Sequence, residues 1–348
     1  FQANGLKVFG PTKKAALLEG SKAFSKNLMR KYGIPTAEFR IFGELAPARR
    51  YIESLNGPVV VKVDGLAGGK GSFVCKDTEE ALKAVEETMG ERVFGPAGEK
   101  VVIEEYLSGE EISILALTDG KTIALLEPAQ DHKALYEGDK GPNTGGMGAY
   151  TPVPLFTTEL SSRVEKEIIV PTVHAMKREG RPYKGVLYVG LMFTAVGPRV
   201  LEYNVRFGDP ETQPLLMRLE GDFLSLLLAT VEERLEEAEF GWDPRTALCV
   251  VMASKGYPGN YEKEKEIKGI ELLTGREDLM VFHAGTALRQ KKVVTAGGRV
   301  LGVTALGKDL LEAQKKAYGA AEKITFDGAY YRRDIGWRAL QKLGARGQ

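Results

Sequence analysis

Residues 59–75 read Val59-Val60-Val61-Lys62-Val63-Asp64-Gly65-Leu66-Ala67-Gly68-Gly69-Lys70-Gly71-Ser72-Phe73-Val74-Cys75, and this stretch decides the fold. Both ends are rich in strand-forming residues, which predicts a β-hairpin with the glycines at its tip. Glycines let backbone amides approach a polyphosphate, and a lysine adds a positive charge for it. The stretch therefore predicts a phosphate-binding hairpin; a flexible hairpin with a solvated lysine is the alternative.

Two common phosphate-binding loops do not fit this stretch. The Walker A register, Gly-x-x-x-x-Gly-Lys-Ser/Thr, is not met. The dinucleotide-binding turn needs a helix directly after its glycines, whereas a strand follows here.

Strands alternate with amphipathic helices on both sides of the hairpin, which predicts an α/β class. We expect helices over 21–31, 78–89, 158–178 and 222–238, strands over 101–105, 112–117, 122–126, 185–194 and 199–205, and a long Gly-rich loop over 130–150. Near residues 238–245 the pattern changes. A separate α+β domain follows, with strands near 247–253, 279–283 and 299–305 and a helix over 310–323.

Residues 6–9 read as a strand that ends at Gly10 and Pro11. A single strand leaves an unpaired edge, so we expect a neighbouring strand beside it. Its partner is not evident in the sequence, which indicates that the chain is part of a longer protein.

Composition excludes several classes of protein. The 348 residues suffice for two or three domains, and the net charge of +1 gives no global field for nucleic acid or membranes. No apolar stretch approaches the roughly 20 residues of a membrane span. The two cysteines, Cys75 and Cys249, lie far apart, which excludes a cysteine-based zinc site and favours the reducing cytoplasm.

Two motifs carry candidate ligands for a nucleotide and a metal. Residues 104–111 hold four carboxylates between two predicted strands, where a purine would find backbone hydrogen bonds and a ribose a carboxylate; a solvated turn is the alternative. Glu202 and Asn204 lie two apart on a strand and so share one face. Their hard oxygens suit Mg²⁺, and a polar strand face is the alternative.

Two further segments carry candidate groups for the substrates. Residues 206–213 read Arg206-Phe207-Gly208-Asp209-Pro210-Glu211-Thr212-Gln213, in which the arginine could grip a carboxylate or acyl phosphate and the two acids an amine. The loop over 130–150 contains successive small residues, whose free amides can form an anion nest. A loop of this length is usually functional or disordered.

In this order, the elements resemble the ATP-grasp superfamily. More narrowly, residues 130–133, 141–150 and 206–213 resemble the phosphoribosylamine–glycine ligase family, and the resemblance extends to 331–337. It implies two α+β lobes that clasp ATP, a C-terminal α+β domain and the tail end of a Rossmann-like N-terminal domain. We expect that remnant over 1–20, the ATP-grasp region over 21–238 with a mobile small lobe near 36–106, and the C-terminal domain over 239–348.

The resemblance also implies roles for particular residues. ATP would be bound by Lys62, Gly68, Gly69, Lys70, Gly71, Glu104, Glu105, Leu107 and Glu111. Mg²⁺ or Mn²⁺ would be held by Glu202 and Asn204. The substrates glycine and 5-phosphoribosylamine would be bound by Asp131, Lys133, Thr144, Gly145, Gly146, Met147, Arg206, Gly208, Asp209 and Glu211, with Arg206 and Lys70 catalytic.

Two departures from the family pattern stand out. The strand before Glu202 reads Val189-Gly190-Leu191-Met192 and lacks the metal-binding carboxylate that many ATP-grasp enzymes carry there. The hairpin has Gly68-Gly69 where the family pattern has Ala-Gly, which we expect to loosen it.

The implied activity is ATP-dependent ligation of glycine to 5-phosphoribosylamine through glycyl phosphate, in de novo purine biosynthesis. ATP turns a carboxylate oxygen into a leaving group, so no enzyme nucleophile is required, and the hairpin would close as a lid against water. Another ATP-grasp carboxylate–amine ligase and a non-catalytic ATP-binding module are the alternatives. We expect a monomer or homodimer, with neither nucleic acid nor membrane as a partner.

Overall fold

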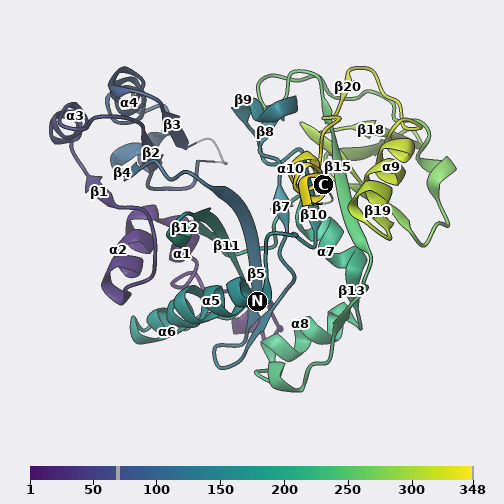
Figure 1. Cartoon of the computed structure of the whole chain (residues 1–348), viewed down its shortest axis with the longest axis horizontal. Helices are drawn as coiled ribbons and strands as arrows, with labels where there is room; N and C mark the ends of the chain where they lie inside the picture. The colour runs from purple at the N-terminus through teal and green to yellow at the C-terminus, as the bar shows by residue number, and fades with distance from the viewer. Residues whose placement is uncertain (68–70, 347–348) are drawn as a thin grey trace. The chain divides into compact units, whose positions relative to one another are not determined.

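The computed structural model describes residues 1–67 and 71–346, and the chain forms two compact units (Figure 1). Unit 1 comprises Phe1–Leu126, Thr158–Phe207 and Leu224–Ala238, and unit 2 comprises Glu127–Thr157, Gly208–Phe223 and Glu239–Gln348. Segments 127–157 and 208–223, expected within the ATP-grasp region, thus pack with the C-terminal residues. No helix in the described ranges has the length and apolar character needed to cross a membrane.

The smaller sheet of unit 1 has the antiparallel order β1-β4-β2-β3. Its strands are Phe39–Phe42, Val101–Glu105, Val59–Val63 and Ser72–Cys75. Helices α3 (Leu45–Glu53) and α4 (Thr78–Val85) lie beside it in Figure 1 and share a core with it that includes Ile52, Val61 and Ile103. The pairing of β2 with β3 confirms the predicted hairpin.

The second sheet of unit 1 has the order β12-β11-β5-β6. These strands span Gly197–Asn204, Gly185–Thr194, Glu110–Thr118 and Ile123–Leu125. Strands β5 and β11 are buried along most of their length, which explains their nearly continuous apolar sequence. The predicted helix over 158–178 forms α5 (Thr158–Val164), a π-helical turn (Glu165–Ile169) and α6 (Val170–Arg178).

Helix α2 (Lys22–Tyr32) begins and ends where its capping residues place it. The Ser21 hydroxyl accepts a hydrogen bond from the backbone N–H of Phe24 at 3.1 Å, and Gly33 takes the left-handed conformation with φ 67°. The Asp64 carboxylate, just after β2, accepts from the Ala23 backbone N–H at 2.7 Å. This bond fixes the start of α2 against the end of β2. The short helix α1 (Leu17–Gly20) precedes it, and α8 (Phe223–Val231) lies later in the chain.

Unit 2 is built on a sheet of order β16-β19-β15-β10-β7, with β20 beside β15. These strands span Leu279–His283, Arg299–Gly307, Thr246–Ser254, Gly148–Thr151, Gln130–Asp131 and Ala329–Tyr330. Its helices are α7 (Thr212–Arg218), α9 (Leu310–Ala321) and α10 (Trp337–Arg346). Three short pairs complete it: β8 (Ala134–Tyr136) with β9 (Lys140–Asn143), β13 (Leu219–Glu220) with β14 (Gly241–Trp242), and β17 (Thr286–Arg289) with β18 (Lys292–Thr295).

Three local predictions were wrong. Residues 6–9 form no strand; Phe9 instead stacks on Phe207, with ring centroids 6.0 Å apart. The predicted loop over 130–150 contains β7, β8, β9 and β10. The helix expected over 222–238 ends at Val231, because Glu233 takes a left-handed conformation with φ 58° that an α-helix cannot continue through.

Candidate functional site

A buried cluster of opposite charges lies between α2, β2 and β4 in unit 1. Lys62 of β2 donates to Glu104 Oε2 at 3.0 Å and to the carbonyl of Leu201 at 2.9 Å. Lys26 of α2 lies 2.8 Å from the same Glu104 oxygen and donates to Thr36 Oγ1 at 2.8 Å. An ammonium group has three N–H donors, so each lysine keeps one for a further acceptor.

The second oxygen of Glu104, Oε1, is buried and has no hydrogen-bond partner among the described residues. Leaving a buried polar atom unpaired costs about 1–3 kcal/mol, so this position favours a ligand that brings a donor. The amino group of adenine is such a donor. This geometry supports the predicted contact of Glu104 with adenine, which stays a prediction.

Lys22 and Lys26 belong to this cluster and were not among the predicted site residues. They lie four residues apart, on one face of α2. Burial lowers the pKa of Lys22; the Glu202 carboxylate opposes this, and the Lys62 ammonium adds to it. Burial also lowers the pKa of Lys26, to about 8. The sequence pattern that could have identified them is the pair of lysines at i and i+4, on the helix face that carries Met29.

Strand β12 presents Glu202 and Asn204 on one half-buried face, with Tyr203 buried between them. Gly190 of β11 pairs with Glu202 and Leu191 pairs with Val200, so Leu201 is an extra residue that forms a bulge. The bulge is where the Leu201 carbonyl meets Lys62. The partner of Glu202 on β11 is therefore a glycine, in keeping with the carboxylate-free strand noted from the sequence.

The described residues contain no group of three or more His, Cys, Asp or Glu side chains arranged to hold a metal ion. A metal at Glu202 and Asn204 would have two protein oxygens and would complete its coordination with phosphates and water. That donor set fits Mg²⁺, which keeps several waters and binds through few carboxylates.

The remaining predicted ATP residues also lie in unit 1. Glu105 ends β4, and its Oε1 accepts from the backbone N–H of Glu38 at 2.9 Å. Leu107 lies in the link between β4 and β5, and Glu111 of β5 pairs with Met192 of β11. A Cβ atom on Gly71 would lie 2.7 Å from Ala67 Cβ, so this position requires glycine. The predicted residues Gly68, Gly69 and Lys70 lie outside the described residues.

The backbone amides of the Gly-rich loop do not form the anion nest expected from the sequence. Each of the four amides over 144–147 donates to a partner within unit 2: Thr144 to the Lys133 carbonyl at 2.8 Å, Gly145 to Tyr257 Oη at 2.9 Å, Gly146 to Thr144 Oγ1 at 3.0 Å and Met147 to the His132 carbonyl at 2.9 Å. The pairing of this loop with residues 130–133 uses two of these donors, those of Thr144 and Met147. Any contact of Thr144–Met147 with substrate would therefore use other atoms.

Unit 2 brings the Gly-rich loop against the segment that starts at Gly208. A Cβ atom on Gly146 would lie 2.3 Å from Pro210 Cδ and 2.7 Å from Asp131 Oδ1, and Gly146 has φ 112°. Only glycine permits this approach. Asp131 and Glu211 are buried here, whereas the Asp209 side chain is half-exposed.

Arg206 lies near the end of the segment Thr158–Phe207 of unit 1. Its side chain is exposed, its Nη1 donates to the Phe207 carbonyl at 3.0 Å, and its Nε lies 3.8 Å from Glu19 Oε1. The guanidinium is therefore accessible to a ligand.

Segment 331–337 anchors the chain that follows Lys133. Arg332 has no exposed surface and donates to the Ala134 carbonyl at 3.0 Å, to Asp139 at 3.1 Å and to Asp334 at 2.8 Å. His132 Nε2 accepts from the backbone N–H of Gly336 at 2.9 Å. Burial lowers the pKa of His132, so its ring is neutral at pH 7. This network accounts for the charged motif near the end of the chain.

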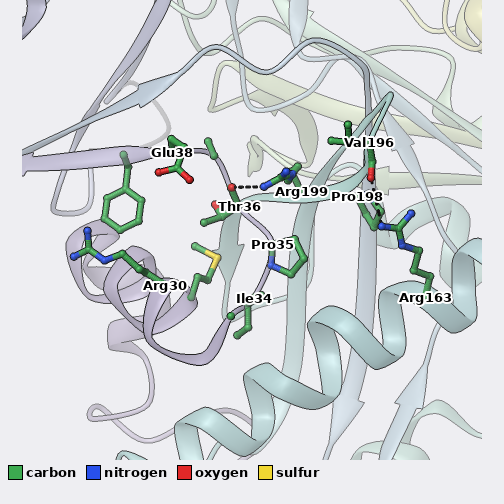
Figure 2. A pocket seen from close by; sticks show the side chains of 13 residues that line it. Arg30, Ile34, Pro35, Thr36, Glu38, Arg163, Val196, Pro198 and Arg199 are labelled. Carbon is green, nitrogen blue, oxygen red and sulfur yellow. Dashed lines mark hydrogen bonds between the residues drawn. The ribbon is translucent and has the colours of Figure 1, made fainter.

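A cavity of about 380 Å³ lies in unit 1, at the end of α2 and beside the β11–β12 turn (Figure 2). Figure 2 shows Arg30, Arg163 and Arg199 around it; Arg199 Nη1 donates to the Thr36 carbonyl at 3.1 Å. None of the predicted site residues lines this cavity. It adjoins the lysine–glutamate cluster at Thr36, which lines the cavity and accepts a hydrogen bond from Lys26.

Comparison with known proteins agrees with this arrangement. Residues 20–212 match the family model described as "Phosphoribosylglycinamide synthetase, ATP-grasp (A) domain", and residues 247–338 match the C domain of the same family. A phosphoribosylamine–glycine ligase from Rhodopirellula baltica is 54% identical over 343 residues, which cover 97% of this chain and 78% of that protein. Its counterpart from Pseudomonas aeruginosa is 49% identical, with 98% and 80% covered.

Solved structures give the same result. The phosphoribosylamine–glycine ligase of Thermotoga maritima superposes with a TM-score of 0.82 at 39% identity, covering 94% of this chain and 81% of that chain. A biotin carboxylase domain from Hydrogenobacter thermophilus superposes with a TM-score of 0.72 at 19% identity, covering 94% and 71%. At that identity the likeness shows the fold alone.

The fold and the cluster of lysines and acids define an ATP-grasp enzyme, an ATP-dependent ligase. Within that class, the chain belongs to the phosphoribosylamine–glycine ligase family.

Proposed function

We propose that this site uses ATP to join glycine to 5-phosphoribosylamine, giving glycinamide ribonucleotide, ADP and phosphate. The γ-phosphoryl group of ATP passes to a carboxylate oxygen of glycine, and ADP leaves. The amine nitrogen of phosphoribosylamine then attacks the carbonyl carbon of glycyl phosphate, phosphate leaves with that oxygen, and the nitrogen loses a proton. Because ATP supplies the leaving group, the protein acts mainly by positioning and by stabilising charge.

The observation that carries the nucleotide role is the lysine–glutamate cluster. Lys26 and Lys62 share one oxygen of Glu104. Lys22 lies near enough to Lys62 and Glu202 for both charges to affect its pKa. Three lysine ammonium groups gather here with the carboxylates of Glu104, Glu202 and Asp64, and the N–H donors that Lys26 and Lys62 keep open suit the oxygens of a polyphosphate. We propose that Lys22, Lys62 and Lys70, the last of which lies outside the described residues, contact the phosphates, and that Glu104 Oε1 accepts from adenine.

Glu202 and Asn204 would hold Mg²⁺ or Mn²⁺ between the protein and the phosphates. A bound metal would neutralise developing charge on the transferred phosphoryl group. The half-buried face of β12 gives both side chains access to a ligand, which supports this assignment.

The proposed substrate residues carry complementary charge. Arg206, with its exposed guanidinium, suits the carboxylate of glycine, and Asp209 suits its ammonium group. Gly208 and Glu211 flank Asp209 along the chain. Asp131, Lys133 and residues 144–147 would meet phosphoribosylamine, with Lys133 as the cation for its phosphate.

Isotope transfer tests the reaction. With [¹⁸O]glycine carboxylate, freshly prepared phosphoribosylamine and ATP, we expect one ¹⁸O atom in each released phosphate, because a carboxylate oxygen leaves with it. Hydroxylamine in place of phosphoribosylamine should trap glycyl phosphate as the hydroxamate. Release of unlabelled phosphate would contradict the acyl phosphate route, and ADP formation with a different amino acid in preference to glycine would favour another ATP-grasp ligase.

A further inference from the structure

One guanidinium joins two segments of the proposed substrate site in unit 2. Arg299, the first residue of β19, donates through Nη1 to the Gly145 carbonyl at 2.8 Å and the Asp209 carbonyl at 2.7 Å. Its Nη2 donates to Asp209 Oδ2 at 3.1 Å. The Arg299 side chain is 20% exposed and that of Asp209 is 46% exposed, so the arginine lies on the inner side of the pair.

Only an arginine can make this set of bonds. Its planar fork carries five donors, whereas a lysine ammonium is a single point with three. The segments that contain Gly145 and Asp209 are far apart in the sequence, and Arg299 donates hydrogen bonds to both of them. A Cβ atom on Gly145 would lie 2.9 Å from Arg299 Cζ, so a glycine there allows the guanidinium to approach.

The bonds leave the Asp209 carboxylate oriented but still accessible. Asp209 Oδ1 accepts from Gln213 Nε2 at 3.0 Å and, more weakly, from Arg299 Nη1 at 3.3 Å. A carboxylate has about four acceptor positions, so capacity remains for one more donor. The half-exposed surface of Asp209 is where that donor would approach.

We infer that Arg299 is a positioning residue that holds the segment for phosphoribosylamine, Gly145–Gly146, against the carboxylate that receives the ammonium group of glycine. The inference rests on the proposed function of these two segments. By fixing both, the guanidinium sets the distance between the attacking amine and the glycyl carbonyl. A misplacement of about 1 Å between reacting groups can cost about 100-fold in rate.

The test compares steady-state kinetics of the full chain carrying Arg299→Lys, Arg299→Met or Gly145→Ala. The last variant keeps the arginine but displaces its guanidinium. We expect kcat/KM for glycine and for phosphoribosylamine to fall about 10- to 100-fold in all three. The KM for ATP should change less than about twofold, since the nucleotide residues lie in unit 1.

Arg276→Met is the matched control, because Arg276 also pairs with an acid, Asp278 at 3.2 Å, but contacts neither substrate segment. It should leave all kinetic constants unchanged. Equal losses for glycine, phosphoribosylamine and ATP, in step with a lowered melting temperature, would reduce Arg299 to a structural role and overturn the inference.

Asp209→Asn separates this inference from the proposed function. If it raises the KM for glycine while Arg299→Lys and Gly145→Ala act like wild type, the inference about Arg299 fails alone. If Asp209→Asn leaves the KM for glycine unchanged, the proposed role of Asp209 fails, and the inference fails with it.

Discussion

Lys26 Nζ lies 2.8 Å from Glu104 Oε2, with 2% of each side chain exposed, and Lys62 reaches the same oxygen at 3.0 Å. Two buried ammonium groups thus share one carboxylate. Because buried charge is stable only when it is paired, this carboxylate holds together α2, β2 and β4.

Replacing Glu104 with Gln should therefore destabilise the protein strongly. Two buried lysines would lose their counter-charge, and breaking a buried pair costs about 3–5 kcal/mol. Urea unfolding measures the change. The control is Glu86→Gln, which removes the exposed pair with Arg49 at 2.9 Å and should cost less than about 1 kcal/mol. If the two substitutions lowered the free energy of unfolding by similar amounts, the view that Glu104 forms buried ion pairs would be contradicted.

The pH dependence of stability should report Lys26. Burial lowers its pKa in the folded protein to about 8, from 10.5 in the unfolded chain. Between these two values the unfolded lysine binds a proton that the folded lysine has released, so the contribution of Lys26 to the free energy of unfolding rises with pH. Below pH 8 both forms are protonated and the contribution is constant.

The measurement is the free energy of unfolding at pH 7.5 and pH 9.5 in wild type and in Lys26→Met. We expect the wild type to gain stability relative to the variant over this interval. Lys31→Met is the control, since Lys31 is exposed and pairs with Glu179 at the surface. Parallel pH profiles for wild type and Lys26→Met would contradict the lowered pKa.

Glu202→Gln should impair turnover far more than nucleotide binding. The substitution removes charge from the proposed metal position, where charge stabilisation is worth several kcal/mol, so we expect a loss of about 100-fold or more in kcat. Binding of adenosine, followed by calorimetry, should persist because Glu104 is unchanged. The control is Glu167→Gln, which removes a surface pair with Arg163. Near-normal turnover of Glu202→Gln at limiting Mg²⁺ would refute the assignment.

Asp139→Asn should weaken the anchor of unit 2 in a pH-dependent way. Burial raises the pKa of Asp139, but His132 and the Arg338 guanidinium outweigh this and hold the pKa well below its usual range. The carboxylate therefore stabilises the fold above about pH 4, and this contribution is lost as the pH falls through the lowered pKa. We expect the variant to lose about 3 kcal/mol at pH 7, because the buried Arg332 and the half-buried Arg338 lose a partner.

Unfolding experiments from pH 7 to pH 2 should show a constant difference between the two proteins above about pH 4 and a shrinking difference below it. Asp327→Asn is the control, because Asp327 is exposed and pairs only at the surface with Lys265. A constant difference between wild type and Asp139→Asn across this range would count against the lowered pKa.

The parts of the fold that could be predicted are those fixed by nearby residues. The β2–β3 hairpin follows from strand formers around glycines, and the limits of α2 follow from Ser21 and Gly33. Glu202 and Asn204 share a face because alternation along a strand is local. Each of these features depends on a few residues that lie close together in the sequence.

The rest depends on contacts between distant residues. Strand β10 exists because it pairs with β15, about 100 residues away, so the loop pattern over 130–150 gave no sign of it. Lys26 meets Glu104 and Arg299 meets Asp209 only after folding. The expected anion nest failed for the same reason, since free amides were inferred from glycines without knowledge of Tyr257 and His132.

The engaged amides of residues 144–147 have a thermodynamic consequence. Their hydrogen bonds form when the polypeptide folds, so the loss of conformational entropy in this segment belongs to folding and not to association. An anion that binds beside residues 144–147 is attracted by charged side chains and not by these backbone amides. Binding of the anion should therefore break few hydrogen bonds in this segment. The affinity for the anion should fall steeply as added salt screens the charge of Lys133.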